Sequence, residues 1–160
     1  MEAVANLAGV SKATVYRWWS NKASLVADAF ASSSLAELRF PDTGSVCTDL
    51  SQQMSHLVNV FKGRRGKLVA SLIGGGQSDP ELIESFVKKF LRPRREEAYL
   101  ILERAVKRGE LPRKLDFDVV LDSLYGPIYM RFLLGHGPLS KTFTDEICDL
   151  VLRPLVIKGK

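Results

Sequence analysis

Hydroxyl and cationic side chains gather between Ser11 and Lys22, and their types suit hydrogen bonding to DNA. The guanidinium of Arg17 can donate to guanine O6 and N7 or to a phosphate, and Thr14 can contact a thymine methyl group or a phosphate. Tyr16 offers a hydroxyl to the sugar-phosphate backbone. This segment therefore predicts binding to double-stranded DNA.

The residues around this segment predict the turn that positions it. Ala5 is small enough for two helices to cross closely, Gly9 can end the first helix in the left-handed conformation, and Ser11 can cap the second helix. This order is typical of a helix-turn-helix, whose second helix enters the major groove. The predicted DNA-contacting residues are Ser11, Lys12, Ala13, Thr14, Tyr16, Arg17, Trp18 and Lys22. A plain helical hairpin with a solvated polar face is the alternative.

The string from Val4 to Leu25 resembles the DNA-binding segment of the tetracycline-repressor (TetR/AcrR) family. The matching features are the Ala-Gly-Val-Ser turn ending at Ser11, the Thr-x-Tyr pair, the aromatic Trp19 and the Lys-x-x-Leu that opens the next helix. The resemblance implies an all-helical homodimeric transcription regulator, usually a repressor, that binds a palindromic operator. Its larger C-terminal domain would bind a small ligand and dimerise.

One departure from the family pattern affects the functional expectation. The family has a further helix ahead of the helix-turn-helix, and here Met1 falls within the first helix of the motif. Apolar surface around Val4, Leu7, Val15 and the two tryptophans is then expected to be exposed. The alternative function is a helical ligand-binding or interaction protein that has lost specific DNA binding.

Composition and apolar spacing predict an all-α protein. The chain has 160 residues, of which 46% are hydrophobic and 26% charged, with a net charge of +5. These values are ordinary for a folded protein and permit an anionic partner. No apolar run is long enough to span a membrane and no signal peptide is evident, so we expect a cytoplasmic protein. Cys47 and Cys148 are too few for a disulfide scaffold and are expected to be free.

Helical periodicity is expected over residues 45–61, 64–73, 79–108, 116–135 and 140–157. Asp79 and Pro80 predict a helix start, Pro93 is expected to divide that helix near Leu91, and Gly109 to end it. A loop over residues 40–44 is expected to act as a hinge. We therefore expect a DNA-binding unit with its connecting helix over residues 1–40 and a larger helical-bundle domain of the TetR C-terminal type over residues 41–160.

The expected ligand pocket and dimer interface both draw on the apolar faces of the larger domain. A core that is entirely intramolecular is the alternative for both. The pocket candidates suit an apolar or aromatic effector and are Met54, Leu57, Phe61, Phe86, Phe90, Tyr99, Tyr125 and Tyr129. The interface candidates in the last two helices are Leu121, Leu124, Ile128, Phe132, Ile147, Leu150 and Val151.

No combination of residues predicts catalysis, a metal site or a cofactor. Gly74–Gly76 resembles an oxyanion-hole glycine run, but the chain lacks the Gly-x-Ser-x-Gly nucleophile motif, so this run is expected to be a loop before Asp79. His56 and His136 lie far apart in the sequence, without cysteines or carboxylates at metal-ligand spacing. We therefore expect no enzymatic activity.

Overall fold

The computed structural model describes residues 1–34 and 38–157, and all regular structure in these ranges is helical. This confirms the all-α prediction. The elements in chain order are α1 (Glu2–Ala8), α2 (Lys12–Trp18), α3 (Lys22–Ser34), α4 (Val46–Lys62), α5 (Arg64–Gly76), α6 (Pro80–Phe86), the π-helical turn η1 (Val87–Leu91), α7 (Arg92–Arg108), α8 (Phe117–Leu134) and α9 (Lys141–Leu152). None of the helices in these ranges has the length and apolar composition needed to cross a bilayer.

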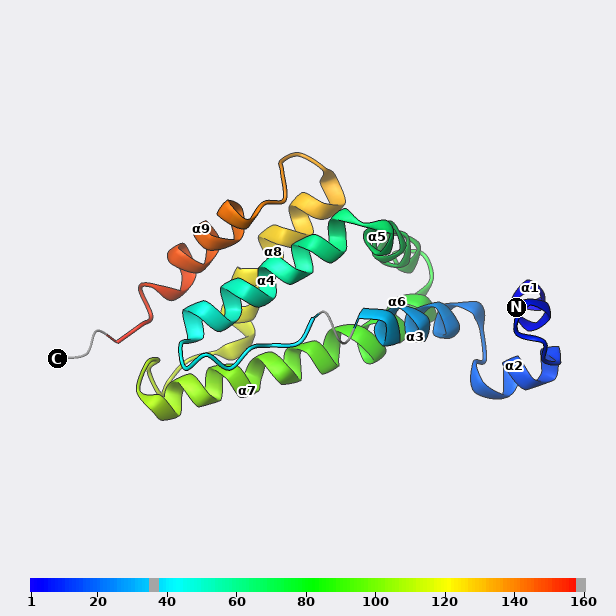
Figure 1. The fold of residues 1–160 in the computed structure, drawn as a ribbon, viewed down its shortest axis with the longest axis horizontal. Coiled ribbons are helices and arrows are strands. Elements are labelled where there is room, and N and C mark those ends of the chain that lie inside the picture. Colours follow the sequence, from blue (N-terminus) through cyan, green and yellow to red (C-terminus); the bar gives the residue numbers. More distant parts are fainter. Residues whose placement is uncertain (35–37, 158–160) are drawn as a thin grey trace.

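The first two helices form a small unit at one end of an elongated molecule (Figure 1). Helix α3 leads from this unit into the larger part, where it packs against α6 and η1. Helix α4 lies in the middle of the larger part and contacts α5, α7, α8 and α9. Helices α1 and α2 and the end of α9 therefore lie at opposite ends of the molecule (Figure 1).

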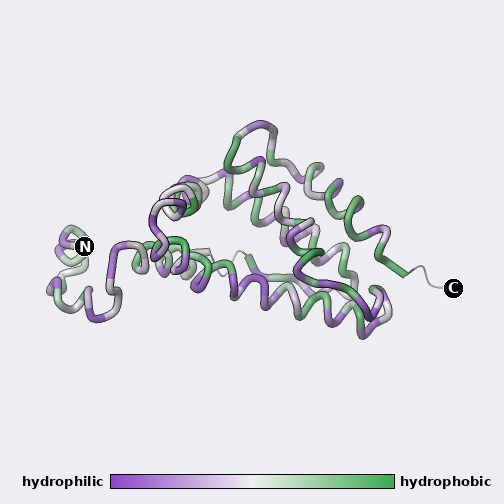
Figure 2. The backbone as a smooth tube through the Cα atoms, turned by 180° about the vertical axis from the view of Figure 1, so that it is seen from behind, coloured by the Kyte–Doolittle hydropathy of each residue, from purple (hydrophilic) through white to green (hydrophobic). Residues whose placement is uncertain are grey.

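A single apolar core fills the larger part. Helix α4 contributes a buried stripe that includes Leu50, Met54 and Leu57, and α8 contributes Leu124 and Ile128. Hydrophobic and hydrophilic residues alternate along the helices when the tube is coloured by hydropathy (Figure 2). This pattern explains the fold, because each amphipathic helix must bury its apolar face against a neighbour.

The helix expected over residues 79–108 is divided where Pro93 predicts. Asp79 caps α6 by accepting a hydrogen bond from the Leu82 backbone N–H at 3.1 Å, and Gly109 ends α7 with φ of 79°. Between α6 and α7 the chain forms the π turn η1. Pro93 lacks a backbone N–H, and its ring would crowd the preceding turn of a regular α-helix, so a wider turn is favoured directly before it.

The glycine run at residues 74–76 is helical, so the prediction of a loop there is wrong. Helix α5 continues to Gly76, where α5 and α6 pack closely. A Cβ atom built on Gly76 would lie 2.8 Å from the Cβ of Ile83, and one built on Gly75 would lie 3.0 Å from Leu82. The missing side chains allow this close approach, which sequence periodicity does not show.

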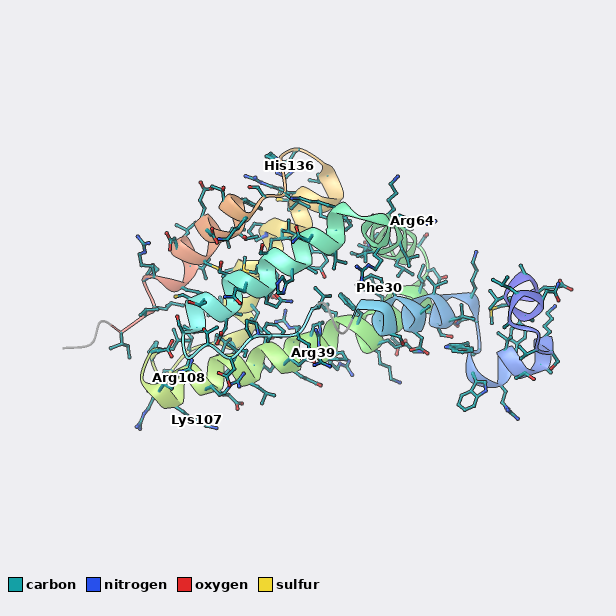
Figure 3. All side chains as sticks on the ribbon, in the orientation of Figure 1. Phe30, Arg39, Arg64, Lys107, Arg108 and His136 are labelled. Atoms are coloured by element: carbon teal, nitrogen blue, oxygen red, sulfur yellow. The ribbon has the colours of Figure 1, made fainter. Side chains whose placement is uncertain are left out.

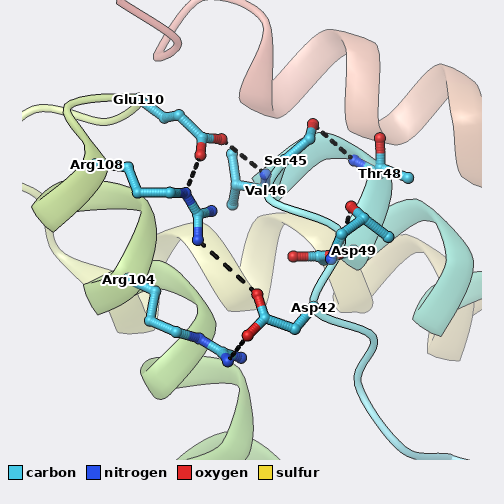
Figure 4. A network of polar contacts seen from close by, with 9 residues as sticks. Asp42, Ser45, Val46, Thr48, Asp49, Arg104, Arg108 and Glu110 are labelled. Atoms are coloured by element: carbon cyan, nitrogen blue, oxygen red, sulfur yellow. Dashed lines mark hydrogen bonds and ion pairs between the residues drawn. The ribbon is translucent and has the colours of Figure 1, made fainter.

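The loop over residues 40–44 is fastened to the helices on both sides. The carboxylate of Asp42 forms ion pairs with Arg104 and Arg108 of α7 (Figure 4). Thr43 donates from its backbone N–H and its hydroxyl to the buried Asp49 carboxylate, at 2.8 and 2.7 Å. Glu110 accepts from the Val46 backbone N–H at 2.8 Å and so ties the start of α4 to the end of α7. These contacts restrict the hinge motion expected at this loop.

Gly66 offers a direct test of the packing between α4 and α5. A Cβ atom at Gly66 would lie 1.9 Å from the backbone oxygen of Phe61, whereas one at Gly74 meets nothing within 4 Å. We expect Gly66→Ala to lower the free energy of unfolding by about 1–3 kcal/mol or more, because the backbone must shift. The matched control Gly74→Ala should be neutral or stabilising by up to about 1 kcal/mol. Urea denaturation measures both, and equal stability of the two variants would contradict this packing.

Candidate nucleic-acid interface and neighbouring cavity

The turn between α1 and α2 has the geometry that its residues predict. Gly9 adopts φ of 66°, in the left-handed region, and ends α1. Ser11 then caps α2, because its hydroxyl accepts a hydrogen bond from the Thr14 backbone N–H at 3.1 Å. Ala5 and Val15 are buried where the two helices contact each other. These contacts fix the angle between α1 and α2.

One face of α2 is open to solvent. Lys12, Ala13, Tyr16 and Arg17 share this face by helical spacing, and all four are exposed. The next residue, Trp18, is 69% exposed. The guanidinium carbon of Arg17 lies over the Trp18 ring, 5.8 Å from the centre of that ring. Trp18 is therefore a surface residue, able to pack on a sugar-phosphate backbone.

The three remaining predicted DNA contacts are Ser11 and Thr14 at the start of α2 and Lys22 at the start of α3. The hydroxyls of Ser11 and Thr14 hydrogen bond to each other at 2.9 Å, so both already take part in the cap of α2. Lys22 is exposed at the first residue of α3. The cationic groups of the set, on Lys12, Arg17 and Lys22, are accordingly free to approach phosphates.

Part of the apolar surface that was expected around α1 and α2, which we call the reading unit, is exposed. Leu7 is 92% exposed, and Val4 and Val10 are also exposed. Val15 does not belong to this surface, because it is buried between α1 and α2. Trp19 is only half-exposed, because it turns toward α3 instead.

A chain of polar contacts joins α2 to the larger part of the molecule. The indole N–H of Trp19 donates to the Asp28 carboxylate on α3 at 2.6 Å. The same Asp28 oxygen accepts from the ammonium group of Lys89, on η1, at 2.7 Å. Lys89 also donates to the Ser24 carbonyl oxygen at 3.3 Å. We call Trp19, Asp28 and Lys89 the relay.

Aromatic packing supports the relay at the same junction. Phe30 of α3, labelled in Figure 3, lies 4.7 Å from the Phe90 ring of η1 and 6.5 Å from the Phe86 ring, centre to centre. All three rings are buried. Edge and tilted contacts of this kind add to the stabilisation from burial. Helix α3 is thus held against η1 by apolar and polar contacts together.

Two residues of η1, Phe90 and Leu91, line a cavity of about 50 Å³. Four of the predicted pocket residues line it, namely Leu57, Phe90, Tyr125 and Tyr129. Phe86 lines a neighbouring hollow of about 310 Å³ that shares Leu91, Arg95, Tyr125 and Tyr129 with the cavity. Phe90, which lines the cavity, therefore directly follows Lys89 of the relay in the sequence.

Three predicted pocket residues, Met54, Phe61 and Tyr99, do not line this cavity. Met54 and Phe61 belong to the packed core, where Phe61 stacks on Phe132 with ring centres 4.1 Å apart. Tyr99 lies outside the cavity and donates its hydroxyl hydrogen to Asp118. Apolar periodicity identifies buried aromatic residues but does not distinguish those beside a cavity from those in the packed core.

Polar groups in the cavity were missed by the sequence reasoning. Gln53 is buried and its side-chain oxygen accepts from the Tyr125 hydroxyl at 2.5 Å. Burial raises the pKa of Tyr125, which keeps this hydroxyl a neutral hydrogen-bond donor. Arg94 is also buried and lines the cavity. A signal was present, since Arg94 interrupts the four-residue apolar series of Phe86, Phe90 and Ala98.

The predicted interface residues of α8 and α9 divide into two groups. Leu121, Leu124, Ile128 and Ile147 are buried in the core of the chain itself. Phe132 and Val151 are half-buried and pack against the core. Leu150 is 79% exposed. Four further apolar residues of α8 are exposed: Val119, Met130, Leu133 and Leu134.

Comparisons with known proteins agree with this arrangement. Residues 1–29 match the model of bacterial regulatory proteins of the tetR family, and residues 40–151 match that of a tetracyclin repressor-like C-terminal domain. The chain is 39% identical to an uncharacterized HTH-type transcriptional regulator of Bacillus subtilis, YdeS, over 99% of this chain and 76% of that protein. It is 34% identical to the DNA-binding transcriptional repressor TetR of Mycobacteroides abscessus, over 99% of this chain and 84% of that protein.

A solved structure shows the same fold. The crystal structure of the TetR family transcription regulator SCO0332 has a TM-score of 0.90 and 32% sequence identity, and the match covers 96% of this chain and 85% of that one. The likeness thus includes both the helix-turn-helix and the larger helical part. The chain therefore belongs to the TetR family of DNA-binding transcription regulators.

Proposed function

We propose that the chain is a ligand-responsive repressor that binds a palindromic operator as a homodimer. The observation that carries this proposal is the exposed face of α2, where Lys12, Tyr16 and Arg17 stand on a helix capped by Ser11. The relay and the cavity beside η1 support control by a ligand. Residues 1–40 would act as the DNA-binding unit and residues 41–160 as the ligand-binding and dimerisation domain.

On this proposal, different residues contact the phosphates and the bases. The ammonium groups of Lys12 and Lys22 would fix the unit on the backbone, and Arg17 would read a guanine edge in the major groove. Trp18 and Tyr16 would pack on or hydrogen bond to the backbone. The positive net charge of the chain favours this encounter.

Arg17→Ala tests the assignment of base reading. We expect it to weaken binding to DNA flanking the protein's own gene by roughly tenfold to a hundredfold, because a bidentate contact to guanine is lost. Lys114→Ala removes an exposed cation in the loop before α8, far from α2 (Figure 1), and should leave affinity unchanged. Fluorescence anisotropy with labelled duplex measures both. Wild-type affinity in the Arg17→Ala protein would remove this residue from the reading face.

Dimerisation is proposed through the exposed apolar faces of α8 and α9. Met130 and Leu134 lie one turn apart on α8, and Leu150 projects from α9 into solvent. Exposed apolar residues on the same two helices are typical of a surface that another molecule covers. A two-fold axis there would present two copies of α2 to half-sites about one turn of DNA apart.

A charge placed on this face tests the interface. We expect Leu150→Glu to raise the dimer dissociation constant by about tenfold or more, since a buried carboxylate would lose its hydration. Leu100→Glu is the matched control, because Leu100 is similarly exposed but lies on α7. Sedimentation velocity at micromolar concentrations gives the association state. If both variants sediment like the wild type, α9 is not the interface.

The relay gives the proposed response a physical path. A ligand beside Phe90 and Leu91 would press on η1, which carries Lys89. Any shift of Lys89 changes its contact with Asp28, and Asp28 in turn holds Trp19 at the end of α2. The ligand would then act by favouring one orientation of the reading unit over another.

Asp28→Ala tests whether the relay holds the reading unit. We expect amide hydrogen exchange over residues 11–19 to rise roughly fivefold, as expected for the loss of about 1 kcal/mol of local stability. Asp122→Ala breaks a comparable ion pair, with Arg95 at 2.5 Å, and should leave these amides unchanged. Mass spectrometry of exchanged peptides reports both regions. Unchanged exchange in α2 of the Asp28→Ala protein would show that the relay does not restrain it.

A further inference from the structure

We propose that the effector is an elongated apolar molecule with an oxygen hydrogen-bond acceptor, a carbonyl or carboxylate, at one end, and that Arg94 binds this end. The inference rests on the proposed function, because it takes the cavity beside η1 as the effector site. It assigns Arg94 a binding role that apolar lining alone would not predict.

One nitrogen of the Arg94 guanidinium, Nε, has no hydrogen-bond partner among the described residues. The side chain is buried, with 8% of the residue exposed. Its Nη1 donates to the Leu38 carbonyl oxygen at 2.6 Å, and its Nη2 pairs with the Glu97 carboxylate. Its Nε has no hydrogen-bond partner among the residues that the structure describes. A buried charged donor without a partner is costly, so a bound acceptor would be favoured there.

A second polar pair stands in the same cavity. Gln53 from α4 and Tyr125 from α8 are hydrogen bonded to each other at 2.5 Å and both line the space that Arg94 lines. The Tyr125 hydroxyl donates its O–H to Gln53, and it can donate to a ligand acceptor instead if Gln53 releases it. Gln53, Arg94 and Tyr125 thus add polar groups to a lining that also includes apolar residues, which is typical of pockets that fix the orientation of a ligand.

The shape of the surrounding space predicts the rest of the molecule. The neighbouring hollow of about 310 Å³ shares Tyr125 and Tyr129 with the cavity as lining residues. Its further walls are mainly apolar and include Ile83, Phe86 and Leu133. An effector that occupies both spaces has its polar end at Arg94 and an apolar body between α6 and α8.

The charges of the lining residues exclude a cationic head group. Arg94 and Arg95 both line the cavity, and no carboxylate does so among the described residues. Arg95 is itself ion paired with Asp118 and Asp122, and Asp122 is the acidic residue lining the neighbouring hollow. An ammonium group would meet two guanidinium groups whose neighbouring carboxylates are already ion paired with them. The site therefore favours an acceptor over a donor.

Three probes with the same apolar chain and different head groups test the proposal. Decanoate, 2-decanone and decylamine are titrated into the protein by isothermal calorimetry. We expect decanoate, 2-decanone or both to bind at least about tenfold more tightly than decylamine, because only they offer an acceptor without a positive charge. The two acceptor arms distinguish a carboxylate from a neutral carbonyl. Equal affinities for all three probes, or binding of none of them, would overturn the proposal.

Arg94→Lys then locates the acceptor site. It keeps the positive charge but removes the Nε donor, and we expect it to weaken binding of the preferred probe about tenfold. Arg92→Lys is the matched control on the same turn, since Arg92 is exposed. If thermal melting shows that Arg94→Lys does not fold, Tyr125→Phe replaces it and should weaken the same probe. Unchanged affinity in the folded variant would contradict the role of this site.

Failure of this proposal is distinguishable from failure of the proposed function. Binding of the free protein to its operator is measured in the absence of any probe. Specific operator binding together with no preference among the probes would overturn only the ligand class. Head-group preference without operator binding would support the cavity and contradict the repressor.

Discussion

Burial of the apolar stripe of α4 is the interaction on which the larger part of the molecule depends. Leu50, Met54 and Leu57 are almost fully enclosed by α5, α8 and α9, and each such side chain contributes roughly 1.5–3 kcal/mol relative to exposure. The same stripe carries Gln53, which faces the cavity and binds Tyr125 of α8. The helix that organises the core therefore also supplies a polar group to the candidate effector site.

The junction between α3 and η1 gives this core a connection to the DNA-reading unit. Pro93 favours a π turn directly before it, and within that turn Phe90 lines the cavity and Lys89 pairs with Asp28. Aromatic packing of Phe30 against Phe90 keeps the two elements together. A short irregular segment, rather than a long rigid helix, thus lies between the two sites. Irregular turns of this kind are frequent at functional positions in helical proteins.

Local chemistry allowed much of the fold to be predicted from the sequence. The left-handed Gly9, the Ser11 cap, the Asp79–Pro80 start and the division before Pro93 each depend on a few neighbouring residues, and the structure confirms them. The sequence was less informative where residues distant in the chain decide the structure. Gly76 is helical where α5 packs closely on α6, and Leu124 and Ile128 are buried within the chain, where α8 contacts α4. The interruption of the apolar stripe at Arg94 is visible in the sequence, but it indicates a binding residue only when the cavity beside it is known.

The central claim is that α2 of this chain reads DNA sequence, and a competition titration tests it most directly. Labelled DNA that flanks the protein's own gene is titrated by fluorescence anisotropy at two salt concentrations, with unrelated duplex as competitor. The account predicts binding that survives the competitor and weakens with salt only as far as its phosphate contacts require. Weak binding that the competitor or the higher salt abolishes would show phosphate attraction alone. That result would contradict the repressor and favour a helical ligand-binding protein without specific DNA recognition.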